Sequence, residues 1–215
     1  MAWRKSKLSF LLLYLCLFLL TPAYSFSQEG IGGASYHALI IGVLQWQDSS
    51  LAPFSKELRK DQELCDTLLE RGLPQKNMSL LLDNEATLAN IRKKLKERLA
   101  QCKEGDTFIF YYAGHGMRAE SGHTYLANVE IDTNKKEKTG FSTKELSTTL
   151  QNFQGEKVIL LADCCYSGAL TEVAKDIAAK GKIAFALTSA AACNASTNNW
   201  TFTQAILNAL QGKPI

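Results

Sequence analysis

The chain has 215 residues, of which 46% are hydrophobic and 21% are charged, and its formal net charge is +3. This length and composition are those of one well-buried globular domain, and they exclude a disordered chain. Because the net charge is small and the lysines are spread along the sequence, electrostatics give no reason to expect a nucleic-acid partner.

The first 25 residues have the pattern of a secretory signal peptide. Basic residues precede an uncharged apolar run, residues 8–20, and small residues then offer a cleavage site. We predict cleavage after Ser25, a flexible mature amino terminus over residues 26–34, and a folded domain over residues 35–215. An uncleaved membrane anchor is the alternative, but the apolar run is shorter than the roughly 20 residues that span a bilayer. We therefore expect export to the periplasm or the extracellular space, without stable membrane insertion once the signal is removed.

Cysteines in the mature chain are odd in number. They are Cys65, Cys102, Cys164, Cys165 and Cys193. In an oxidising compartment an odd number leaves at least one thiol unpaired or bonded between molecules. At least one of these thiols therefore needs a reason other than an internal disulfide.

From residue 35 onward, apolar runs alternate with patterns of helical spacing. The apolar runs predict strands over residues 37–43, 78–82, 107–113, 158–162 and 182–188. The helical patterns predict helices over residues 55–71, 88–102, 142–153, 170–180 and 202–210. A polar insertion, residues 117–140, holds one short apolar piece that we interpret as a hairpin or an edge strand. Ser142 is expected to cap the third helix, with Glu145 returning the bond.

Strands that alternate with helices predict an α/β fold, a three-layer sandwich with a mostly parallel central sheet and helices on both faces. In such sheets, ligands bind outside the carboxyl ends of the strands. The third strand ends in Gly114-His115-Gly116 and the fourth in Asp163-Cys164-Cys165. If these strands are neighbours, about 4.8 Å apart, an imidazole and a thiol face one crevice.

A thiol and an imidazole in one crevice can carry out nucleophilic catalysis. The thiolate is the nucleophile, and the imidazole generates it and later protonates the leaving amine. Backbone N–H groups in glycine-rich turns, such as that of Gly116, can stabilise the oxyanion. The alternatives are that Gly-His-Gly is only a tight turn and that Cys164 and Cys165 are small buried hydrophobes. A redox or metal role is disfavoured because adjacent cysteines have the wrong spacing for either.

Residues 110–116, Phe-Tyr-Tyr-Ala-Gly-His-Gly, and residues 158–168, with their Asp-x-Cys-x-Ser-Gly pattern, resemble the caspase-like cysteine peptidases. Within that family they are similar to the metacaspases and the bacterial caspase homologues. Supporting matches extend along most of the mature chain, in residues 36–42, 58–69, 125–132 and 200–210. The resemblance implies the caspase-like sandwich fold, with the strand order 2-1-3-4-5. It also implies a cysteine endopeptidase that acts on a protein or peptide substrate.

The resemblance also implies a role for each matched residue. His115 matches the catalytic histidine and Cys165 the nucleophile, and the backbone amides of Gly116 and Cys165 match the oxyanion hole. Asp163 and Asp61 match two acids that line the pocket for a basic side chain, which implies cleavage after Arg or Lys rather than after Asp. For Asp61, a solvated helix carboxylate is the alternative. For the whole domain, the alternative is a catalytically silent interaction module.

Several features depart from the family pattern. Tyr166, Ala113 and Cys164 stand where histidine, serine and serine are common. The connection over residues 169–181 reads as a helix rather than a long cleavable linker, which implies single-chain activity without obligatory processing. Members of the family usually continue beyond the last predicted helix. Two explanations are therefore open: the chain lacks an edge strand at its carboxyl end, or it is a fragment of a longer protein.

Metacaspases often require calcium, but we predict no metal ligands here. The acids near the polar insertion, Glu130, Asp132 and Glu137, lie among lysines, and converging oxygen ligands cannot be assembled from them. The sequence requires no cofactor, and it leaves the calcium requirement and the oligomeric state open.

Overall fold

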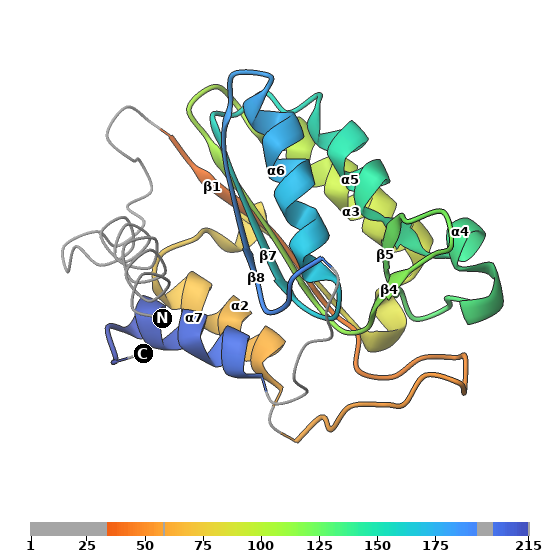
Figure 1. Cartoon of the computed structure of the whole chain (residues 1–215). Coiled ribbons are helices and arrows are strands. Elements are labelled where there is room, and N and C mark those ends of the chain that lie inside the picture. Colours follow the sequence, from red (N-terminus) through yellow and green to blue (C-terminus); the bar gives the residue numbers. More distant parts are fainter. Residues whose placement is uncertain (1–33, 58, 193–199, 215) are drawn as a thin grey trace, which may run out of the picture.

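A computed structural model describes residues 34–57, 59–192 and 200–214, and it has a three-layer α/β architecture (Figure 1). The central sheet is parallel throughout, and its strand order is β2-β1-β3-β7-β8. The strands are β1 (Tyr36–Gly42), β2 (Met78–Leu82), β3 (Thr107–Ala113), β7 (Lys157–Asp163) and β8 (Ile183–Thr188). The predicted fold class and strand order are thus confirmed, with β7 and β8 as the fourth and fifth predicted strands. The predicted signal peptide lies outside the described residues.

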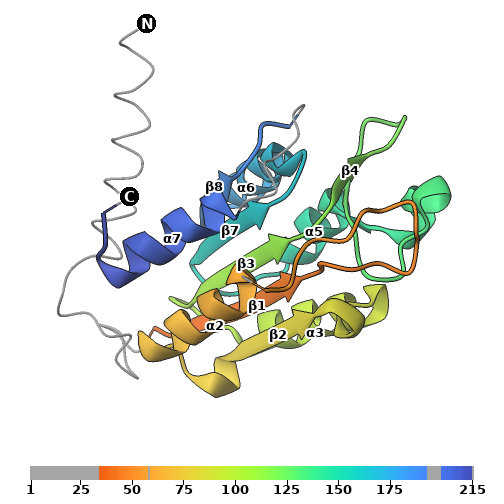
Figure 2. The same ribbon diagram turned by 90° about the horizontal axis from the view of Figure 1, so that it is seen from below.

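Helices cover both faces of the sheet (Figure 2). One face carries α2 (Lys60–Glu70) and α7 (Thr201–Gln211). The other carries α3 (Leu88–Gln101), α5 (Thr143–Leu150) and α6 (Leu170–Ala178). Two apolar cores result, one on each side of the sheet. Among the described residues, no helix is long and apolar enough to cross a membrane.

Strand β3 lies at the centre of the sheet, between β1 and β7. All of its residues are buried, because side chains alternate between two covered faces. Phe108, Phe110 and Tyr112 belong to the core beneath α3, α5 and α6, whereas Ile109 and Tyr111 belong to the core beneath α2 and α7. The alternation explains why the sequence of this strand is continuously apolar, and it places Tyr111 and Tyr112 on opposite sides of the sheet.

The polar insertion forms a small antiparallel sheet, which confirms the predicted hairpin. Its strands are β4 (Gly116–Arg118), β5 (Thr124–Leu126) and β6 (Phe141–Ser142), in the order β4-β5-β6. A short helix, α4 (Lys136–Thr139), lies between β5 and β6. Single turns of 3-10 helix complete the described elements: η1 (Gln75–Asn77), η2 (Asp83–Glu85), η3 (Thr133–Lys135) and η4 (Ser167–Ala169).

Two helix termini refine the sequence predictions. The hydroxyl of Ser142 accepts a bond from Glu145 N at 2.9 Å, which confirms the predicted cap. The prediction that the Glu145 side chain returns the bond is wrong, because its carboxylate pairs instead with Arg92 of α3, with its oxygens 2.6 and 2.9 Å from the guanidinium. Helix α2 begins at Lys60, and the prediction that it starts at residue 55 is wrong. Residues 55–57 are polar and exposed, so they have no apolar face to pack against the sheet.

Candidate active site

The carboxyl ends of three neighbouring strands form one row across the sheet. Gly42, the last residue of β1, is paired with Ala113 of β3, which is paired with Asp163 of β7. His115 and Cys165 each follow this row by two residues, at strand ends that are adjacent in the sheet. The register therefore places His115 and Cys165 at the same end of the sheet, the carboxyl end of its strands, despite their separation in sequence.

Gly116 brings the backbones of these two strand ends into contact. A Cβ atom on Gly116 would lie 1.8 Å from the carbonyl oxygen of Cys165 and 3.1 Å from the sulfur of Cys164. No side chain fits in that space, so the close approach requires glycine. The Gly-His-Gly sequence is therefore more than a tight turn, because Gly116 lets the ends of β3 and β7 approach each other closely.

The ring of His115 is held by a loop that the sequence analysis did not connect with it. It packs against both Trp46 and Phe54, in tilted geometry, with ring centroids 4.4 and 4.5 Å away. Its Nε2 lies 3.0 Å from the carbonyl oxygen of Ala52. A carbonyl can only accept, so Nε2 carries the proton of the neutral ring and Nδ1 is the basic nitrogen. Ala52 thereby fixes the tautomer that a general base needs.

The backbone at His115 is anchored as well. The carbonyl oxygen of His115 lies 2.9 Å from the hydroxyl of Tyr112 and accepts a bond from Ala127 N at 2.9 Å. Burial raises the pKa of Tyr112 well above its usual range, so the hydroxyl keeps its proton and remains a donor. The histidine is therefore positioned from both its ring and its main chain.

The two adjacent cysteines occupy different environments. Cys164 is buried in the core beneath α3, α5 and α6, and burial raises the pKa of its thiol well above the usual range. Cys165 is partly exposed and follows the carboxyl end of β7. A thiolate forms and reacts where solvent and substrate reach it. The geometry thus favours Cys165 over Cys164 as the reactive thiol.

The chain turns sharply after Cys165. Tyr166 has φ 56° and ψ 14°, the left-handed region that residues other than glycine rarely adopt. The hydroxyl of Ser167 then accepts a bond from Ala190 N at 3.1 Å, which ties the turn to the loop after β8. Residues held in this way against their intrinsic preference cluster at functional sites.

Of the described cysteines, Cys65, Cys102 and Cys164 are buried free thiols. Cys65 and Cys102 lie in the cores on opposite faces of the sheet, so they cannot pair with each other. Burial raises the pKa of Cys65 to about 11 and that of Cys102 to about 12, so both stay protonated at neutral pH. Cys193 lies outside the described residues.

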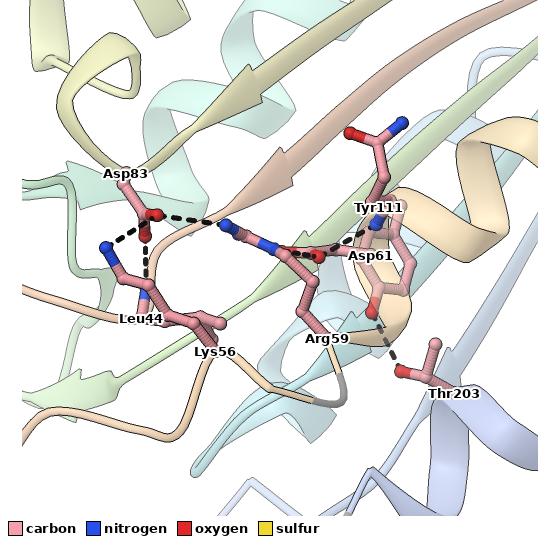
Figure 3. A network of polar contacts seen from close by, with 8 residues as sticks. Leu44, Lys56, Arg59, Asp61, Asp83, Tyr111 and Thr203 are labelled. Carbon is pink, nitrogen blue, oxygen red and sulfur yellow. Dashed lines mark hydrogen bonds and ion pairs between the residues drawn. The ribbon is translucent and has the colours of Figure 1, made fainter.

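Asp163 is held on the face that carries α2 and α7. Its Oδ2 accepts a bond from the hydroxyl of Thr203 at 2.7 Å and one from Thr203 N at 3.3 Å. The same hydroxyl lies 2.7 Å from that of Tyr111 (Figure 3). The first turn of α7 thus anchors the carboxylate at the end of β7.

Asp61 is fully buried, which excludes the solvated helix carboxylate as its state. Its oxygens accept bonds from Arg59 Nε at 2.8 Å and from Arg59 Nη2 at 2.7 Å (Figure 3). Burial raises the pKa of Tyr111 well above its usual range, and the negative charges of Asp163 and Asp61 raise it further. Asp61 contacts Gly42 at the end of β1 and Asp163 ends β7, so the two acids lie on either side of Ala113 at the carboxyl end of the sheet.

Among residues 34–57, 59–192 and 200–214, no group of three or more His, Cys, Asp or Glu side chains is arranged to hold a metal ion. Of the acids near the insertion, Asp132 pairs with Lys135 at 3.1 Å and Glu137 accepts a bond from Ser121 at 2.5 Å.

Comparison with known proteins gives a family match over the whole described domain. The caspase domain, as a family, matches residues 35–213. Metacaspase-2 of Trypanosoma brucei brucei is 28% identical over 159 residues, which are 66% of this chain and 44% of that protein. Metacaspase-7 of Arabidopsis thaliana is 24% identical over 123 residues, which are 49% of this chain and 28% of that protein. The chain therefore spans less than half the length of the curated relatives that it matches.

A solved structure supports the fold independently. Protein GSU0716 from Geobacter sulfurreducens superimposes with a TM-score of 0.54 over 83% of this chain and 82% of its own, at 15% sequence identity. At this identity the likeness concerns the fold alone.

Proposed function

This chain belongs to the caspase domain family of cysteine peptidases, and from that premise we propose that it is a cysteine endopeptidase with a dyad of His115 and Cys165. The observation that supports the proposal is the contact at Gly116 between the ends of β3 and β7. His115, whose tautomer is set by Ala52, follows β3, and the partly exposed Cys165 follows β7. Cys164, the other thiol on that strand end, is buried, which supports Cys165 as the nucleophile of the two.

The proposed reaction follows from the protonation of His115. Nδ1 of the ring takes the proton of the Cys165 thiol, and the thiolate attacks the scissile carbonyl carbon. The backbone amides of Gly116 and Cys165 stabilise the resulting oxyanion. The imidazolium then protonates the leaving amine as the carbon–nitrogen bond breaks. Water, deprotonated by the same ring, hydrolyses the thioester and restores the thiol.

Cleavage after Arg or Lys is the specificity that the acid pair supports. Asp163 is bonded to Thr203 of α7 and Asp61 lies on α2, over the end of β1, so both acids lie on the face of the sheet that carries α2 and α7. Carboxylates in a site that excludes water bind a guanidinium or an ammonium group strongly. A substrate with Asp before the scissile bond would meet charge of the same sign.

Hydrolysis of fluorogenic peptides that differ only in the residue before the cleaved bond tests this proposal. The mature protein, under reducing conditions, is expected to cleave peptides ending in Arg or Lys at least about 100-fold faster than the peptide ending in Asp, since an unpaired like charge costs several kcal/mol. Each assay is run with calcium and with a chelator, because the calcium requirement is open. If the folded protein cleaves none of the peptides in either condition, the domain is the catalytically silent interaction module.

We also propose export and single-chain activity. The signal pattern of residues 1–25 supports export, and amino-terminal sequencing of the exported protein is expected to begin at Phe26. The connection from β7 to β8 consists of η4, α6 and short turns, so it holds no long linker to cleave. If single-chain activity is correct, the active enzyme is expected to run as one uncut band in a denaturing gel.

A further inference from the structure

The carboxylate of Asp61 is already bonded to a guanidinium group of the same chain, that of Arg59. Arg59 donates from Nε and Nη2 to the two carboxylate oxygens of Asp61, in the two-pronged geometry that arginine and carboxylate prefer. The Asp61 side chain is 0% exposed, whereas that of Arg59 is 18% exposed. Arg59 therefore lies between the carboxylate and the solvent.

The position of Asp61 is fixed by the sheet beneath it. A Cβ atom on Gly42 would lie 1.6 Å from Asp61 Oδ2, so the carboxylate rests directly on the last residue of β1. Gly42 is paired with Ala113, and Ala113 with Asp163. Asp61, on α2, thus lies over the end of β1, and Asp163 lies at the end of β7, so the two acids are on either side of Ala113, about 10 Å apart by strand spacing. The end of β3 lies between them.

Arg59 uses the bonds that a substrate arginine would need. Both oxygens of Asp61 accept from Arg59, and Oδ1 also accepts from Gln62 N at 2.8 Å. A second guanidinium cannot make the same two-pronged contact while Arg59 is in place. A buried carboxylate without any cation is costly, so Asp61 exchanges one cation for another rather than standing alone.

Arg59 has a second acidic partner that can hold it when it leaves Asp61. Its Nη1 donates to Asp83 Oδ2 at 2.9 Å, and the Asp83 carboxylate is 16% exposed. Asp83 is itself positioned by Leu44 N, at 3.0 Å, and by Lys56 Nζ, at 3.1 Å (Figure 3). Arg59 also precedes α2, with an extended backbone, and is not locked within the helix. Movement toward Asp83 therefore leaves the arginine charge paired.

We propose that Arg59 is an internal occupant of the acidic pocket and competes with the basic side chain of the substrate for Asp61. The resting protein then has a low affinity for basic substrates, and productive binding shifts Arg59 onto Asp83. Arg59 is a specificity-determining residue in this scheme, because it decides which basic groups can displace it. As it concerns the substrate, the inference rests on the proposed peptidase function.

Binding of benzamidine, a small amidinium compound, tests the occupancy without any need for catalysis. If Arg59 fills the pocket in nine molecules of ten, its removal lowers the apparent Kd for benzamidine about tenfold. Arg59→Gln is expected to show this gain in calorimetric titration, and its melting temperature, lowered by the unpaired Asp61, is expected to rise again with benzamidine. Benzamide, which is neutral and of similar shape, is expected to do neither.

Three further variants make the binding test decisive. Arg59→Lys keeps the charge but cannot make the two-pronged bond, so it folds and is expected to fall between wild type and Arg59→Gln. The double variant Arg59→Gln/Asp61→Asn is expected to lose the gained affinity. Arg92→Gln removes another two-pronged pair, on the exposed surface with Glu145, and is expected to bind benzamidine like wild type. Equal affinity in wild type, Arg59→Lys and Arg59→Gln would overturn the inference.

Peptide hydrolysis then separates this inference from the proposed function. In an active enzyme, Arg59→Gln is expected to lower KM for the Arg peptide about tenfold with little change in kcat, because the occupant and not the dyad has changed. An unchanged KM would overturn the competition. If no variant cleaves any peptide while the benzamidine results hold, the occupancy stands and the peptidase function fails.

Discussion

Cys165→Ala is expected to abolish peptide hydrolysis, while Cys164→Ala keeps most of it. Removing a nucleophile that forms the covalent intermediate costs on the order of 10⁴-fold or more in kcat. Cys165 is the partly exposed thiol at the sheet edge, and its backbone meets Gly116. Cys164 is buried in the core with a raised thiol pKa, so its removal leaves only a small cavity, at a cost of about 1 kcal/mol in stability.

The two variants control for each other. They remove the same sulfur atom from adjacent positions, and kcat/KM and the melting temperature are measured on both. Loss of activity in Cys164→Ala with full activity in Cys165→Ala would mean that the wrong thiol has been assigned. Equal, partial losses in both would indicate damage to the strand end rather than loss of a nucleophile.

Gly116→Ala is expected to reduce kcat at least about 100-fold, because a displacement of the order of 1 Å at a reacting group has this effect. The new Cβ would lie 1.8 Å from a backbone carbonyl oxygen, that of Cys165, which cannot rotate out of the way. One strand end must move away from the other, which separates His115 from Cys165 and displaces both proposed oxyanion donors. The variant is therefore expected to fold with reduced stability and to lose activity beyond that reduction.

Gly181→Ala is the matched control for this substitution. Gly181 lies in the turn before β8, at the opposite end of the strands, and a Cβ there would meet nothing within 4 Å. Its φ of +79° makes alanine cost about 1–2 kcal/mol in stability, with kcat expected to be unchanged. Full activity in Gly116→Ala would show that the contact between the strand ends is not needed for the reaction.

The strands of the central sheet could be predicted because each is a run of mostly apolar residues, whereas the strand order came from the family resemblance. The positions of His115 and Cys165 just after neighbouring strands could be predicted from the same pattern, since the carboxyl ends of neighbouring parallel strands lie at one end of the sheet. The sequence left open whether both cysteines are buried, and the structure buries Cys164 but leaves Cys165 partly exposed.

The contacts made by loops could not be predicted from the sequence. Ala52 bonds His115 through its carbonyl group, which every residue has, so no residue type marks it. Arg59 lies in a stretch that the apolar spacing assigned to a helix, and its extended backbone is what lets its side chain reach Asp61 and Asp83. Thr203 meets Asp163 only because α7 folds back onto the sheet.

The site of covalent labelling by a peptide inhibitor tests the dyad most directly. A chloromethyl ketone with arginine beside the reactive group is incubated with the folded wild-type protein, and the modified residue is located by mass spectrometry of the digest. One adduct, on Cys165, is expected, and labelling is expected to be lost in Cys165→Ala and at least about 100-fold slower in His115→Ala, since a positioned general base contributes 10²–10⁴-fold. An adduct on Cys164, or equal rates with and without His115, would contradict the assignment of His115 and Cys165 as the catalytic pair.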